Sequence, residues 1–95
     1  MSIEEIKHKI EPILKQHGVK YAALFGSAAR GEDHPQSDVD ILVRLGRPTG
    51  MIGYMRLIEG LESSLQKKVD LVTEGSLNKH VRPYVLPDLK VIYEE

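Results

Sequence analysis

The stretch from residue 39 to residue 73 most constrains the fold, because its pattern predicts a strand, a helix and a second strand. Val39 to Leu45 is a short apolar run, and "KKVDLVT" at 67–73 is a second one. Between them, apolar side chains recur at helical spacing: Met51, Tyr54, Met55, Ile58, Leu61 and Leu65. A helix that crosses between two strands of one sheet makes those strands parallel. We therefore expect 39–45 and 67–73 to form a parallel pair.

The residues before this unit predict one more helix and one more strand. A helical stripe near the N-terminus consists of Ile3, Ile6, Ile10, Ile13, Leu14 and His17. Pro12 interrupts that helix with a missing hydrogen bond, so we expect a kink or a break there. "VKYAALF" at 19–25 is a buried strand, and its short connection to 39–45 predicts an antiparallel pair.

The last segment, "LKVIYEE" at 89–95, predicts an edge strand or an extended tail. With it, the elements make an α+β fold of α/β-like order. We expect a small mixed β-sheet of three to four strands with helices packed against it.

Length and composition limit the class of protein. The 95 residues predict a single domain spanning 1–95, and the net charge of −1 disfavours nucleic acid as a partner without excluding it. There are no cysteines, so thiolate metal ligands are excluded. No apolar run is long enough to span a bilayer, and "MSIEEIKHKI" lacks the pattern of a secretory signal. The expected location is the cytoplasm, with no membrane partner.

Three aspartates indicate a metal site. Asp38 and Asp40 point to the same side of a strand, where two like charges repel unless a cation lies between them. Asp70 sits between Val69 and Leu71 in the next strand of the predicted parallel pair. If the two strands are neighbours, all three carboxylates can share one face. Magnesium prefers such oxygen ligands.

Gly26 and Ser27 indicate a phosphate site beside these carboxylates. A strand that ends at Phe25, followed by glycine and by serine at the start of a helical turn, presents backbone N–H groups to an anion. Phosphate binding and metal binding on consecutive strand ends together predict a site for a nucleoside triphosphate with magnesium.

Ordinary structural roles compete with each of these interpretations. Gly26 and Ser27 can form a simple helix cap, the Asp-x-Asp pair can be turn chemistry, and Asp70 can be an edge-strand charge. The conjunction of all three is rarer than any one of them. For the stripe at Met51, Tyr54, Met55 and Ile58, we favour core packing over an exposed docking patch.

"GSAARG" at 26–31, followed by "SDVD" at 37–40, resembles the signature of the DNA polymerase β-like nucleotidyltransferase superfamily. In length the chain resembles the minimal nucleotidyltransferases, the MntA-type antitoxins of HEPN/MNT toxin–antitoxin pairs. The resemblance implies the nucleotidyltransferase fold. It also implies that Gly26 and Ser27 hold phosphates, and that Asp38 and Asp40 ligate two magnesium ions. Asp70 is implied to help bind the metal and to take a proton. Arg30 matches the motif arginine, which touches phosphate or braces the loop.

The same resemblance implies an activity: transfer of AMP from ATP to a tyrosine of a HEPN toxin. Because a chain this short leaves no residues for an acceptor domain, the acceptor site is expected to be shared with a partner or with a second copy of the chain. Two alternatives stay open from the sequence. One is an antitoxin that neutralises its toxin by contact alone, and the other is a transferase acting on an RNA end or a small molecule.

Overall fold

A four-stranded mixed sheet is the centre of the fold in the computed structural model, which describes residues 2–31, 38–76 and 89–95. The strand order is β3-β2-β1-β4. Their bounds are β1 Val19–Phe25, β2 Val39–Leu45, β3 Val69–Thr73 and β4 Lys90–Glu94. β1 is antiparallel to both β2 and β4, whereas β2 and β3 are parallel. The predicted mixed sheet is confirmed, and the last segment is an edge strand. The segment "EDHPQS" at 32–37, whose composition predicts a loop, lies outside the described residues.

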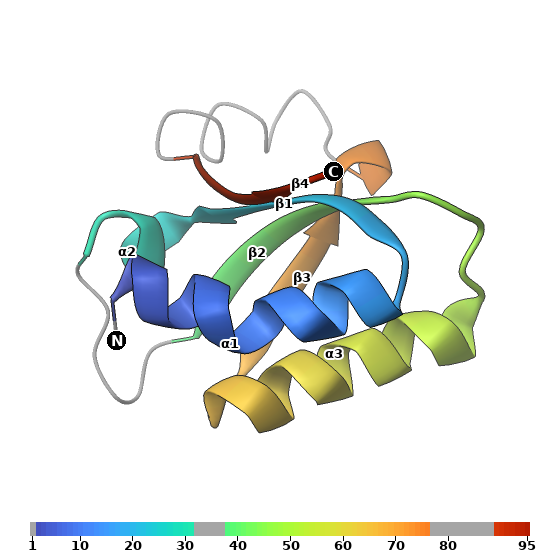
Figure 1. The fold of residues 1–95 in the computed structure, drawn as a ribbon, viewed down its shortest axis with the longest axis horizontal. Helices are drawn as coiled ribbons and strands as arrows, with labels where there is room; N and C mark the ends of the chain where they lie inside the picture. Colours follow the sequence, from blue (N-terminus) through green and yellow to red (C-terminus); the bar gives the residue numbers. More distant parts are fainter. Residues whose placement is uncertain (1, 32–37, 77–88) are drawn as a thin grey trace.

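The two long helices cover one face of the sheet, as Figure 1 shows. They are α1, Ile3–Gln16, and α3, Met51–Leu65; α2, Gly26–Ala29, is a single turn after β1, and a 3-10 turn, η1, spans Glu74–Ser76. Between helices and sheet lies an apolar core whose largest members include Ile6, Ile10, Leu14, Leu24, Ile41, Leu57 and Leu61. The core residues of β2 alternate with Asp40, which therefore points to the sheet face opposite the helices.

Helix α1 runs through Pro12 without interruption, so of the predicted kink or break, the break is wrong. Ser2 caps its first turn, since the Ser2 hydroxyl accepts a hydrogen bond of 3.1 Å from the Glu5 N–H. Pro12 cannot bond to the carbonyl of His8, but both residues lie on the exposed side of the helix. Water can satisfy that carbonyl, so the proline costs less there than it would in the core.

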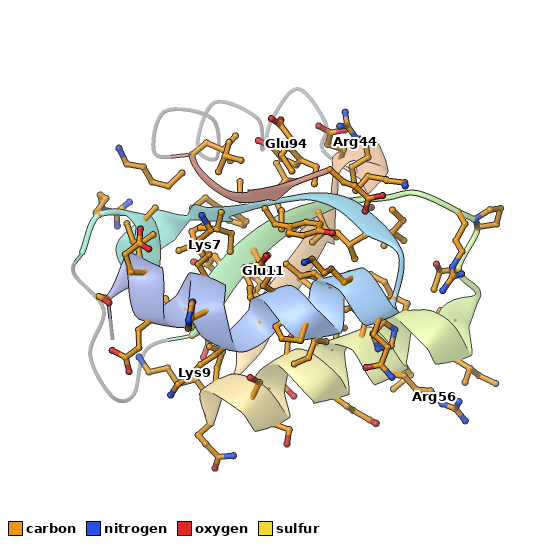
Figure 2. All side chains as sticks on the ribbon, in the orientation of Figure 1. Lys7, Lys9, Glu11, Arg44, Arg56 and Glu94 are labelled. Atoms are coloured by element: carbon orange, nitrogen blue, oxygen red, sulfur yellow. The ribbon has the colours of Figure 1, made fainter. Side chains whose placement is uncertain are left out.

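The interpretation of the α3 stripe as core is wrong for two of its members. Met51 is 75% exposed and Met55 53% exposed, whereas Leu57, outside the predicted stripe, is fully buried. At 3.6 residues per turn, Met55 lies about 160° from Leu57 around the helix, outside the buried arc. Met51 belongs to the first turn. Arg56, on the same helix, points to solvent (Figure 2).

Candidate active site

Asp40 and Asp70 are register partners on the parallel strands β2 and β3. Their carboxylates lie close enough to hydrogen bond when one of them is protonated. The strand pairing explains the contact, because partners on neighbouring strands direct their side chains to the same face. The strand pairing thus accounts for one part of the predicted grouping of three carboxylates, the placement of Asp70 beside Asp40.

The electrostatics of Asp40 are those of a carboxylate that is hard to ionise. Burial has the largest effect, and the negative charges of Asp70 and Asp38 and the hydrogen bond to Asp70 act in the same direction. Together they raise the pKa of Asp40 from 3.8 to about 6, although the guanidinium of Arg30 acts in the opposite direction. The metal-free pair therefore shares a proton more readily than two isolated aspartates.

Gly26 packs directly against Asp40. Phe25, the residue before it, is the register partner of Asp40 across β1 and β2. A Cβ atom at position 26 would overlap Oδ2 of Asp40, and the backbone φ of +69° is one that glycine adopts without strain. Glycine at this position therefore makes room for a carboxylate, a role that the motif alone did not reveal.

The other predicted residues surround this centre. Ser27 is half-buried in the first turn of α2, and Arg30 is exposed at its C-terminal end. Asp38 is exposed and immediately precedes β2, within reach to raise the pKa of Asp40. The charge of Arg30 also acts on Asp40, where it lowers the pKa.

The donor chemistry at this site fits magnesium. Asp40 and Asp70 offer oxygen ligands, and their mutual repulsion would be relieved by a divalent cation. Across residues 2–31, 38–76 and 89–95, however, no three histidine or acidic side chains are grouped closely enough to hold an ion by themselves. The carboxylates of Asp40 and Asp70 therefore lie together, and that of Asp38 is close enough to act on Asp40. Magnesium commonly completes its shell with water and substrate phosphates.

Two residues of α3 contact the strand that carries Asp70, and sequence reasoning missed both. The hydroxyl of Tyr54 donates a 2.6 Å hydrogen bond to the carbonyl of Leu71, and Oε2 of Glu62 accepts a 2.9 Å bond from the N–H of Val69. The sequence predicts Tyr54 as core and Glu62 as an ordinary exposed acid. Their eight-residue spacing, which places both on one side of a helix, was the available signal.

Comparison with known protein families agrees with this geometry, which is a mixed sheet with a glycine turn and an acidic pair on adjoining strand ends. A family model described as "Nucleotidyltransferase domain" matches residues 7–93. The chain belongs to this nucleotidyltransferase family, and it is an enzyme of that class. The resemblance drawn from 26–31 and 37–40 is confirmed.

Two similar proteins carry names that state a protein adenylyltransferase activity. The chain is 45% identical over 86 residues to a candidate protein adenylyltransferase of Methanocaldococcus jannaschii, covering 90% of this chain and 92% of that protein. It is 36% identical over 94 residues to the protein adenylyltransferase MntA of Thermococcus cleftensis, covering 94% of each.

Solved structures agree in fold. One described as a minimal nucleotidyltransferase is 33% identical with a TM-score of 0.77, covering 94% of each chain. A chain from a crystal structure of a toxin–antitoxin with AMP-PNP is 28% identical with a TM-score of 0.79, covering 94% of this chain and 73% of that one.

Within the described residues, no helix is both long and apolar enough to cross a bilayer.

Proposed function

We propose that this chain is a magnesium-dependent protein adenylyltransferase. It transfers AMP from ATP to a hydroxyl group of a partner, a tyrosine of a HEPN-domain toxin, and so acts as an antitoxin in the cytoplasm. Residues 1–95 form a single nucleotidyltransferase domain in this proposal. The observation that carries it is the facing pair of Asp40 and Asp70 beside Gly26. The similarity to MntA and to the toxin–antitoxin with AMP-PNP supports the choice of donor and partner.

Each site residue has a role in the proposal. Asp38, Asp40 and Asp70 hold two magnesium ions, and the backbone at Gly26 and the Ser27 hydroxyl bind the phosphates. Magnesium, when bound, acidifies the acceptor hydroxyl and offsets the charge of the triphosphate. Arg30, whose charge already acts on Asp40, keeps the loop after α2 in place.

The reaction itself needs no covalent intermediate on the protein. The acceptor oxygen forms a bond to the α-phosphorus of ATP while the bond from that phosphorus to the bridging oxygen breaks, and pyrophosphate leaves with the electron pair. Asp70 takes the proton of the acceptor hydroxyl. The protein contributes positions and electrostatics rather than bonds.

A labelling experiment tests the proposal. The purified protein is incubated with magnesium, a HEPN-domain toxin as the candidate partner, and ATP labelled on either the α- or the γ-phosphate. We expect label on the partner from α-labelled ATP only, and a tyrosine that gains the mass of one AMP group. Label from the γ-phosphate would indicate a kinase instead, and α-label appearing only on added RNA or a small molecule would indicate a different acceptor.

The double variant Asp38→Asn, Asp40→Asn separates catalysis from contact. We expect it to bind the partner but to transfer no AMP, and to leave cells unprotected from the toxin. Protection by this variant would instead support an antitoxin that acts by contact alone. Circular dichroism of the variant provides the control for folding.

A further inference from the structure

β3 is held from its outer side by α3. In the order β3-β2-β1-β4, β3 is an edge strand of the sheet. The carbonyl of Lys68 accepts a 2.9 Å hydrogen bond from the N–H of Val39, which places the backbone groups of Lys68 toward β2. Backbone groups of a strand alternate in direction, so those of Val69 and Leu71 point away from β2. These are the two residues that flank Asp70.

Two of these outward groups, one on each residue, receive a partner from α3. The N–H of Val69 donates to Oε2 of Glu62, and the carbonyl of Leu71 accepts from the hydroxyl of Tyr54, at 2.9 and 2.6 Å. The two side chains come from turns of α3 that are eight residues apart. Their hydrogen bonds hold β3 at the residue before Asp70 and at the residue after it.

The turn between α3 and β3 also restrains the start of β3. Gln66 ends α3 in the left-handed conformation, with φ 55°. Its side-chain Nε2 donates a 2.6 Å hydrogen bond to the carbonyl of Ser63. Glu62 thus bridges a tight turn from the end of the helix to the first residue of the strand. A strand fixed on both edges has little freedom to slide or twist relative to β2.

We propose that Tyr54 and Glu62 are positioning residues, which clamp the outer edge of β3 and so hold the carboxylate of Asp70 opposite Asp40. The role rests on the proposed function, in which Asp70 takes part in nucleotidyl transfer. Neither residue touches the substrate in this proposal. A displacement of Asp70 by a fraction of an ångström lowers the rate of transfer more than it lowers the affinity for ATP, because the turn at Gly26 and Ser27 also holds the phosphates.

Two variants and two controls test the clamp. Tyr54→Phe removes only the hydroxyl, and Glu62→Ala removes the acceptor for the Val69 N–H. Glu62→Gln keeps an oxygen at the same length and serves as the rescue variant. Ser64→Ala is the matched control, since the Ser64 hydroxyl donates a 2.8 Å bond from the same helix to the carbonyl of Lys9 on α1 rather than to β3.

We expect Tyr54→Phe and Glu62→Ala to lower kcat for AMP transfer by about tenfold or more, with KM for ATP changed less than about twofold. Glu62→Gln and Ser64→Ala should keep kcat within about twofold of the wild type. Unchanged kcat in both Tyr54→Phe and Glu62→Ala would overturn the clamp. So would an equal loss in Ser64→Ala, because it would indicate a general effect of loosening α3.

A second measurement does not depend on turnover. Amide hydrogen exchange at Val69 should be faster in Glu62→Ala than in the wild type and restored in Glu62→Gln. Unchanged exchange would contradict the clamp. Asp70→Asn separates the two proposals: if it retains AMP transfer, the proposed role of Asp70 fails. If it loses transfer while the clamp variants keep theirs, only the clamp fails.

Discussion

Asp40 and Asp70 are register partners on two parallel strands, and their carboxylates lie close enough to hydrogen bond when one of them is protonated. Such a contact between two acids is unfavourable unless they share a proton or a cation. Core residues occupy the neighbouring positions of both strands, so the two aspartates are held at a rigid part of the sheet. A pair held in this way has consequences for stability, metal binding and catalysis that can be measured separately.

Replacing Asp40 by asparagine should stabilise the metal-free protein. The pKa of Asp40 is raised to about 6, so folding disfavours its ionised form, and the wild type loses stability relative to Asp40→Asn as pH rises from 3.8 through that value. Above it the difference persists. Because the carboxylate is only half-buried, we expect a gain of about 1–2 kcal/mol near pH 7. Urea unfolding in EDTA across this pH range measures it, and a less stable variant at neutral pH would contradict the account.

Magnesium should stabilise the wild type and not the variants of the acidic pair. An ion that binds only the folded state, present at about ten times its dissociation constant, adds about 1.4 kcal/mol to the free energy of unfolding. We expect this increase in the wild type and its loss in Asp40→Asn and Asp70→Asn. Thermal unfolding with and without magnesium measures the difference. An equal increase in all three proteins would place the ion elsewhere.

Gly26→Ala should disrupt the site more than an equally strained glycine substitution does. Gly26 and Gly31 have nearly the same backbone angle, φ +69° and +72°, but only at Gly26 would a Cβ meet the carboxylate of Asp40. We expect each variant to lose about 1 kcal/mol or more from backbone strain. Gly26→Ala should in addition lose AMP transfer by about a hundredfold, through displacement of Asp40. Equal transfer rates in the two variants would remove Gly26 from the site.

Substitutions along α3 should separate its buried arc from its exposed side. Leu61→Ala should destabilise the protein by about 2–5 kcal/mol, because Leu61 is fully buried in the core. Met55→Ala should change stability by less than about 0.5 kcal/mol, because Met55 is 53% exposed. Chemical unfolding of both variants measures the contrast. A large loss in Met55→Ala would mean that this side of the helix is covered.

Much of the fold was predictable because each prediction depended on local patterns and on chain connectivity. The helix between residues 45 and 69 leaves few alternatives to a parallel pair, and short connections favour antiparallel neighbours. The errors arose where tertiary contacts outweigh local preference. Pro12 is tolerated because it and His8 lie on the exposed side of α1. Met51 and Met55 are exposed because the buried arc of α3 passes through Leu57.

The chemical content of the site was predictable, but its register was not. Periodicity places Asp40 and Asp70 on the same face without stating that they are direct partners. That pairing depends on contacts made by Lys68 and Glu62 at the start of β3. The fit between Gly26 and Asp40 likewise depends on the register of β1 with β2.

The central claim is that the carboxylate of Asp70 takes part in AMP transfer opposite Asp40. The most direct measurement is the single-turnover rate of AMP transfer to the partner by Asp70→Asn, at saturating ATP and magnesium. Removal of a group that both holds magnesium and accepts the proton should slow the rate by about a hundredfold to ten-thousandfold, with the fold retained. A rate within about threefold of the wild type would contradict the account.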